Sequence, residues 1–214
     1  MAISFIAYTE NSSGWGNSIA VDKPSSQAAD LCVVCLQKQG SETVTVPSGF
    51  NGIDSQYPRT SGSGYYIQFF SKTLDGTEGS TLTFSWTTEG DSIKTLAMVF
   101  RGAAAHDVIN KQYMSGGQDI VFPGVTTSQA DELLLAVFVA ANAANAWDSP
   151  LTEICDSGTS ALWTAGWGEQ AASGPTGDKT ATSDWPSAFV AYLLAFLPAG
   201  PTVDPGSVWI RVDL

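Results

Sequence analysis

The sequence predicts an all-β protein: a two-sheet antiparallel sandwich, jelly-roll-like and built from two similar halves. Apolar and polar residues alternate over short segments, as in Leu82-Thr-Phe84-Ser-Trp86, which is the period of a strand with one buried face. Clusters of Gly, Ser, Thr and Asp separate these segments, as turns do. No segment combines an apolar stripe at helical spacing with a cap at each end.

The elements follow from these patterns in chain order. Alternation indicates half-buried strands at residues 65–69, 82–86 and 208–214. Continuous apolar runs indicate strands buried on both faces, and these runs are residues 31–36, 133–139 and 189–196. Residues 3–8 are expected to form an edge strand. Residues 103–114 show neither pattern, so a loop or a short helix is expected there.

An internal repeat supports the two-halves interpretation. Ser26-Gln27-Ala28 recurs 102 residues later as Ser128-Gln129-Ala130, and each triplet precedes an acidic residue and a buried strand. Residues 16–102 and 117–197 therefore align as a pseudo-repeat. The alternative is the loose self-similarity that any β protein shows.

The chain is expected to divide into one β-sandwich domain over residues 1–197, a Pro/Gly linker over 198–206 and a C-terminal strand over 207–214. Three prolines make the linker stiff. The last strand either seals a sheet edge of its own subunit or pairs with a neighbour's edge. Its candidate assembly residues are Val208, Ile210, Val212 and Leu214.

Charge excludes some partners. Charged residues are only 14% of the chain, against about 25% in an average domain. Acidic residues number 21 and basic residues 9, which gives a net charge of −12. This balance repels phosphate backbones and anionic membranes, so neither nucleic acid nor a membrane is expected as a partner.

Sequence patterns also predict where the protein is made. The longest apolar run, residues 133–141, is about half the length of a membrane helix. The start of the chain lacks the cationic region of a signal peptide, and three cysteines are an odd count. Synthesis in the cytoplasm with reduced thiols is therefore expected.

Few residues suggest catalysis. Cys32 and Cys35 lie three apart on a predicted strand, so they face opposite sides and cannot share a metal; we expect both to fill the core. His106 is the only histidine and is expected on a solvated loop, and no G-x-S-x-G motif is present. We therefore expect no catalytic residue, no cofactor and no metal site.

Acidic residues keep one enzymatic alternative open. A glycosidase needs only two carboxyl groups flanking a sugar. Three pairs lie close in sequence, namely Asp75 with Glu78, Glu89 with Asp91, and Asp131 with Glu132. Their turn-like contexts also explain them as turn residues, and a structural ion at residues 75–78 is a further alternative.

Seven tryptophans are the most unusual feature of the composition. Trp86, Trp163 and Trp209 are expected on strands, in the core or on a sheet face. Trp15, Trp147 and Trp185 fall in predicted loops. A loop aromatic can contact a protein partner or stack on a sugar ring, or it can cap the open end of a sandwich.

The order of motifs in residues 16–102 resembles a known family. A turn at residues 24–30 precedes the buried strand 31–36, followed by Pro47-Ser-Gly-Phe50 and later by Phe100-Arg-Gly102. This order resembles β-sandwich domains of tailed-bacteriophage virion proteins and prophage tail regions, with a weaker echo in residues 117–197. Ala29-Asp30 stands where that family usually has Gly-Asp, and Phe50 stands where Trp is common.

The resemblance implies a structural or attachment part of a virion, with no catalytic residue to transfer. Our leading hypothesis is a phage capsid decoration or tail-associated protein, located in the virion, that works by contact with other virion proteins and as a homo-oligomer. One alternative is a virion module that binds host-surface glycan through Trp15, Trp147 and Trp185. A second is a glycoside hydrolase that uses loop carboxylates.

Overall fold

The computed structural model describes residues 2–58, 64–114, 117–139, 144–156, 163–183 and 190–200. Within these ranges the chain forms strands and no helix, and the ladders are antiparallel. The predicted all-β antiparallel class is therefore confirmed. The same ranges contain no helix that is long and apolar enough to span a membrane.

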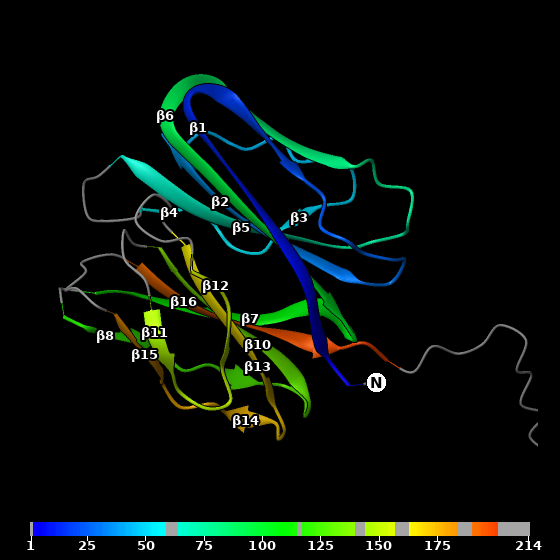
Figure 1. Cartoon of the computed structure of the whole chain (residues 1–214), viewed down its shortest axis with the longest axis vertical. Helices are drawn as coiled ribbons and strands as arrows, with labels where there is room; N and C mark the ends of the chain where they lie inside the picture. Colours follow the sequence, from blue (N-terminus) through cyan, green and yellow to red (C-terminus); the bar gives the residue numbers. More distant parts are fainter. Residues whose placement is uncertain are drawn as a thin grey trace, which may run out of the picture.

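The first large sheet uses the N-terminal part of the chain, and its strand order is β1-β6-β2-β5-β3, with β4 also paired to β5 (Figure 1). Its strands are β1 (Ser4–Asp22), β2 (Leu31–Gln39), β3 (Asn51–Gly52), β4 (Tyr57–Pro58), β5 (Tyr65–Thr73) and β6 (Thr81–Arg101). The N-terminal segment forms an edge strand, as predicted from residues 3–8.

The second large sheet uses the rest of the chain in the order β12-β13-β10-β16-β7. Its strands are β7 (Ala103–Tyr113), β10 (Glu132–Val139), β12 (Thr152–Asp156), β13 (Trp163–Gln170) and β16 (Val190–Pro198). Two small sheets accompany it. They consist of β11 (Ala144–Trp147), β15 (Lys179–Ser183) and β8 (Asp119–Phe122), and of β14 (Gly174–Pro175) and β9 (Thr126–Thr127).

The two large sheets pack face to face over one central core. Leu96 and Phe100 of β6 belong to the same buried cluster as Leu135 of β10. Phe69 of β5 meets Tyr192 of β16 edge to face, with ring centroids 4.9 Å apart. Burial of apolar surface from both sheets in one cluster therefore holds the two parts of the chain together.

Strand β2 is buried on both faces, as its continuous apolar run predicts. Val33 and Cys35 point into the central core, whereas Cys32 and Val34 point into a second core on the outer side of the sheet. Successive side chains of a strand face opposite ways, so the two cysteines are separated by the sheet. The prediction that they fill the core is confirmed, and both are free thiols.

The outer core exists because the β1–β6 ribbon curls over its own sheet. The pairing register shifts between Gly16 and Ser18, and beyond this point the ribbon folds back. Ile19 and Phe84, from the returning part, pack in one cluster with Val34 of β2. The result is a curled half-barrel closed over a hydrophobic interior (Figure 1).

A third core covers the outer face of the second large sheet. Ile120 and Phe122 of β8 pack against Leu134 and Phe138 of β10, so the small β11-β15-β8 sheet acts as the covering layer. Strand β10 is consequently buried on both faces, as its apolar run predicts. Each large sheet thus has its own outer cover in addition to the shared core.

Several predictions from the sequence are wrong. Trp15 and Trp147, expected in loops, lie within strands β1 and β11. Residues 103–114, expected as a loop or a short helix, contain strand β7, which pairs with β16 along its length. Its residues are mostly half-buried because β7 is an edge strand. The segment therefore lacks the alternation of buried apolar and exposed polar residues by which a strand is recognised in a sequence. The linker at 198–206 beyond Gly200 and the strand predicted at 207–214 lie outside the described residues.

Candidate functional site

The exposed large aromatic residues lie on edge strands. Among the described residues, Tyr8 is 41% exposed, Trp15 62% and Tyr113 41%, and no other large hydrophobic residue is classed as exposed. Tyr8 and Trp15 belong to β1, and Tyr113 belongs to β7. Within the described ranges β1 pairs only with β6, and β7 pairs only with β16. An edge strand with exposed aromatics is a surface suited to another chain.

Trp15 sits at the bend of the curled β1–β6 ribbon, opposite Asp91 in the register. Its indole Nε1–H donates a hydrogen bond to Glu89 Oε2 at 2.9 Å. The backbone of Ser92 has a φ of 49° at this bend. The ring is thus oriented by one carboxylate while most of its surface faces solvent.

Trp147 occupies a different environment. Its ring stacks on Phe122, with centroids 5.6 Å apart and planes 14° from parallel. It also lies against Gly166, where a Cβ would come within 2.6 Å of the indole. This placement favours the capping interpretation for Trp147. Trp185 and the candidate assembly residues Val208, Ile210, Val212 and Leu214 lie outside the described residues.

Tyr113 belongs to a polar and aromatic network that joins the two sheets on one side of the molecule. Its ring stacks on Tyr57 of β4 at 5.1 Å between centroids, and its hydroxyl donates to the Pro58 carbonyl at 3.1 Å. Lys111 Nζ lies 4.4 Å from the Tyr57 ring centre and forms an ion pair with Asp54. This side of the sandwich is therefore closed by specific contacts.

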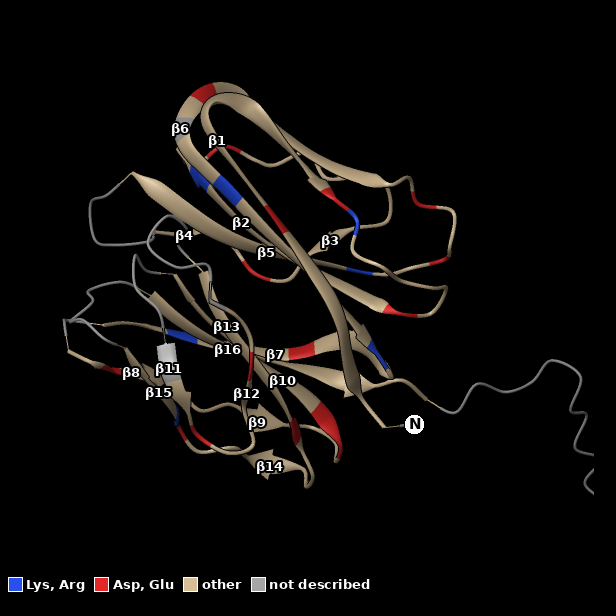
Figure 2. Ribbon diagram, viewed as in Figure 1, with Lys and Arg blue, Asp and Glu red and all other residues tan. Residues whose placement is uncertain are grey.

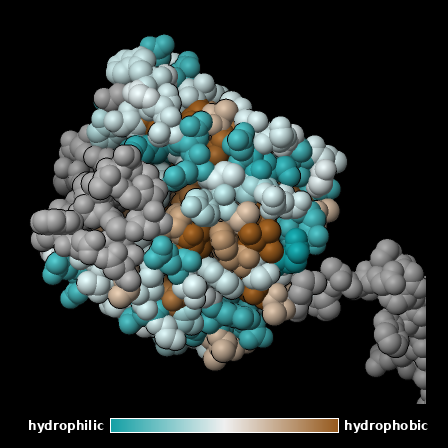
Figure 3. Space-filling view, viewed as in Figure 1, coloured by the Kyte–Doolittle hydropathy of each residue, from teal (hydrophilic) through white to brown (hydrophobic). Residues whose placement is uncertain are grey.

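The opposite side is more apolar. Phe5 of β1, Ile154 of β12 and Trp167 of β13 are half-buried and pack against the central core. Figure 3 shows hydrophobic groups gathered near the middle of the face on which β1 and β12 lie in Figure 1. The two strands are the edges of their respective sheets, so this face offers apolar surface beside strand edges that have no partner among the described residues.

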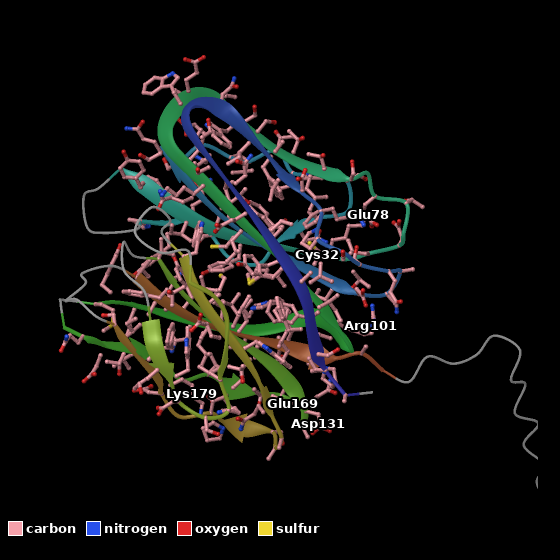
Figure 4. The ribbon with its side chains drawn as sticks, in the orientation of Figure 1. Cys32, Glu78, Arg101, Asp131, Glu169 and Lys179 are labelled. Atoms are coloured by element: carbon pink, nitrogen blue, oxygen red, sulfur yellow. The ribbon has the colours of Figure 1, made fainter. Side chains whose placement is uncertain are left out.

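Of the three carboxylate pairs predicted as alternatives, Asp75 with Glu78 is engaged by local contacts, and so is Glu89 of the second pair. Lys72 Nζ binds Glu78 Oε1 at 2.7 Å and Asp75 Oδ2 at 3.4 Å. Hydrogen bonds from Thr77 lower the pKa of Asp75 to about 2. Glu89 accepts from Trp15. Figure 2 shows the acidic residues mainly at bends and strand ends of the viewed face, and Figure 4 places Glu78 at such a bend.

His106 is not on a solvated loop, contrary to expectation. It lies on β7, half-buried, with its ring edge-on to Phe196 at 5.7 Å between centroids. Burial lowers its pKa because the interior disfavours the imidazolium. Together with Asn51 and Thr73 it lines a surface cavity of about 430 Å³.

The motifs that carry the family resemblance are joined by an ion pair between the buried Asp30 and the partly exposed Arg101. Arg101 donates to Asp30 through Nε at 2.9 Å and through Nη2 at 3.1 Å. Asp30 is 1% exposed, so a two-pronged guanidinium contact satisfies its charge. Phe50 packs edge to face with Phe84 of the curled ribbon. These motif residues therefore hold the curled sheet together.

Across the described parts of the chain, no group of three or more His, Cys, Asp or Glu side chains is arranged to hold a metal ion. No known protein family, curated protein or solved structure matches this chain. Sequence reasoning found Trp15 but missed Tyr8, Tyr113 and the Asp30–Arg101 pair. Exposure on an edge strand and contacts between distant residues have no local sequence signal.

Proposed function

We propose that this chain is a structural protein of a bacteriophage particle, a capsid decoration or tail-associated component that works by protein–protein contact. The observation that carries the proposal is the location of the exposed aromatics. Tyr8, Trp15 and Tyr113 lie on β1 and β7, each paired on one side only within the described residues. Edge pairing and aromatic burial are the means by which identical or different chains assemble.

The motif residues give a second line of support for the phage class. The turn that ends in Asp30 and the Phe100-Arg-Gly102 segment are the two ends of the resemblance, and the Asp30–Arg101 ion pair joins them. A motif whose parts contact one another across 71 positions specifies a fold. The residues of this motif contribute to packing within the fold, and this agrees with a structural role for the protein.

The architecture predicted from the repeat belongs to the same proposal. We infer two copies of one curled unit, jelly-roll-like in that a long ribbon folds back over its own sheet. In the first sheet β2 lies between β6 and β5, and in the second β10 lies between β16 and β13. The covering layers correspond too. The end of β1 pairs with the beginning of β6 in the first half, and β8 pairs with β15 in the second.

The native mass of the full chain, measured by light scattering at several concentrations, tests the protein-contact proposal. We expect a stable oligomer that dissociates when Tyr8→Lys and Tyr113→Lys place charges on the two edges. Thr83→Lys is the matched control, because Thr83 is exposed on the returning ribbon and carries no aromatic surface. A monomer at every concentration would count against the homo-oligomer. A native particle without a contact of this chain above about 1,000 Å² would overturn the proposal.

A second candidate function is glycan binding at the ribbon bend. An indole that is 62% exposed beside a carboxylate offers a sugar a stacking face and a hydrogen-bond acceptor. Titration of host-surface polysaccharide against tryptophan fluorescence tests it. Trp15→Ala should abolish the response, whereas Trp147→Ala, which removes a packed indole, should retain it. Equal binding by both variants would remove this candidate.

A further inference from the structure

Two turns of like sequence lead into the two fully buried strands. Residues 26–30 precede β2, residues 128–131 precede β10, which begins at Glu132, and both turns begin with Ser-Gln-Ala. Each places a residue with a side chain in the left-handed region, Ala29 with φ 70° and Asp131 with φ 59°. The next residue in each case is a buried acid whose carboxyl group needs a partner.

The first turn satisfies its acid with a cation. Asp30 accepts a hydrogen bond from the Gln27 backbone N–H at 2.9 Å. Arg101 contacts both carboxylate oxygens of Asp30. A guanidinium and a carboxylate neutralise each other, so this buried charge has a full complement of partners.

The second turn presents its acid to another acid. Glu132, 0% exposed, accepts from the Gln129 backbone N–H at 2.7 Å through Oε1. Asp107 of β7 accepts from the Ser128 backbone N–H at 2.9 Å and from the Ser128 hydroxyl at 3.0 Å. The other oxygen of Glu132, Oε2, is buried without a hydrogen-bond donor among the described residues. No ion pair within those residues involves Glu132 or Asp107.

We propose that Glu132 is a proton-binding site: it keeps its proton near neutral pH and donates it from Oε2 to the Asp107 carboxylate. The shared proton then provides the buried acid of the second turn with a partner, as Arg101 does for the buried acid of the first turn. It joins β7 to the turn before β10, and the contact is lost when rising pH removes the proton. Two ionised carboxylates in this position would leave a buried charge unpaired.

The electrostatic surroundings agree with this assignment. Burial raises the pKa of Glu132, and the nearby Asp107 charge raises it further. Burial opposes ionisation of Asp107 as well, but the hydrogen bonds from Ser128 keep its pKa below the ordinary value. Glu132 is therefore the proton donor of the pair, and Asp107 is the acceptor.

The other titratable groups around the pair do not supply a replacement for the proton. His106 precedes Asp107 on β7, and burial lowers the pKa of its imidazole, which disfavours the charged form. Asp131 is in the turn itself, and Glu169 of β13 faces Leu133 in the register; Figure 4 shows both at the same end of the second sheet. On the other flank β16 places Phe196 opposite Leu133.

A metal ion fits this site less well than a proton. Calcium takes six to eight oxygen ligands, whereas three of the four carboxylate oxygens here already accept an N–H or O–H. Only Glu132 Oε2 is left for a ligand. A single unpartnered oxygen in a carboxyl group that interacts with a neighbouring carboxylate suits one proton.

The test is the pH dependence of thermal unfolding of the full chain. Because the folded pKa of Glu132 is raised, its contribution to stability is complete below the unfolded pKa and is lost as pH rises through the folded pKa. We expect the melting temperature to fall by several degrees between about pH 5 and about pH 8. Glu132→Gln supplies a permanent N–H donor, so it should remove most of this fall and melt higher than the unmodified chain at the upper pH.

Controls separate the proton from general charge effects. Glu153→Gln changes the net charge equally at an exposed position of β12 and should keep the full pH dependence. An unchanged pH slope in Glu132→Gln would overturn the proposal, as would calcium raising the melting temperature of the unmodified chain at about pH 8 but not that of Glu132→Gln. Should Glu132→Gln not fold, carbon NMR of the Glu132 carboxyl in the unmodified chain decides: a titration midpoint at or below the ordinary 4.5 refutes it.

Discussion

At the scale of single residues, close packing decides what each position tolerates. Tyr192 and Phe69 share the central core, and Trp147 lies directly on the backbone of Gly166. Protein interiors are packed as densely as organic crystals, so a single added methyl group at such a contact has a measurable effect. Burial also sets the chemistry of side chains, as the cysteines illustrate.

Gly166→Ala is expected to destabilise the protein. The new Cβ would lie within 2.6 Å of the Trp147 ring, and overpacking of this kind costs about 1–3 kcal/mol. Urea unfolding of Gly166→Ala, Trp147→Ala and the double variant measures it. The double variant should lose less stability than the sum of the single variants, because removing the indole removes the clash. Strict additivity would contradict the contact.

The thiols are expected to be unreactive in the folded protein. Burial raises the pKa of Cys32 to about 12 and that of Cys35 well above its usual value, and Cys155 is 3% exposed. The thiolate is the reactive form, so a thiol reagent at neutral pH should label none of the three before unfolding and all three in denaturant. Rapid labelling of the native chain would show that β2 is accessible to solvent.

At the scale of elements, edge strands and sharp connections explain both the surface and the folding of the chain. Strand β7 follows β6 after the single residue Gly102, so the chain passes from one sheet to the other at this point. Gly102 has a φ of +80°, and its carbonyl accepts from the Ala199 N–H at 2.7 Å. The backbone conformation at the last position of the Phe100-Arg-Gly102 motif therefore requires glycine.

Gly102→Ala should destabilise the chain by about 2 kcal/mol or more, since it combines a left-handed backbone with a clash. A Cβ here would lie 2.7 Å from the Ala2 carbonyl oxygen. Gly79→Ala is the matched control, because a Cβ there meets nothing closer than 3.9 Å. Chemical denaturation compares the two variants. Equal stabilities would show that the connection tolerates a side chain.

At the scale of the whole molecule, the shared core couples the two sheets. Leu135 of β10 and Leu96 of β6 belong to one buried cluster, although each sheet also has an outer core of its own. Unfolding either sheet would expose the inner face of the other. The two parts should therefore unfold together.

Leu135→Ala tests this coupling. We expect a loss of about 2–5 kcal/mol from the cavity it creates, with circular dichroism and tryptophan fluorescence shifting to the same new midpoint. Thr83→Ala, at an exposed position of the returning ribbon, serves as the comparison and should change little. Separate midpoints for the two probes would show that the sheets unfold independently.

The sequence predicted what local periodicity controls. The apolar runs at residues 31–36 and 133–139 lie in strands buried on both faces, and Cys32 and Cys35 lie on opposite sides of β2. Trp86 and Trp163 are buried, as expected for strand residues. Alternation reports burial directly, because the side-chain period of a strand is two.

The candidate site was predicted less completely. Trp15 was predicted as an aromatic beside glycine in a loop, whereas it lies at the bend of the β1–β6 ribbon. Tyr113 lies in a segment without a clear hydrophobic period, because one side of an edge strand is exposed to solvent. Trp147 was also predicted in a loop and yet packs on Phe122.

By itself, then, the sequence determined the all-β class, the doubly buried strands and the placement of the cysteines. The tertiary structure alone decided that residues 103–113 are a strand, that Tyr8 and Tyr113 lie on the edge strands of the described sheets, and which partner each buried turn acid receives. Asp30 meets Arg101, whereas Glu132 meets Asp107. Strand patterns act over neighbouring residues, but edges and charge partners depend on segments far apart in the chain, which only the folded sheets bring together.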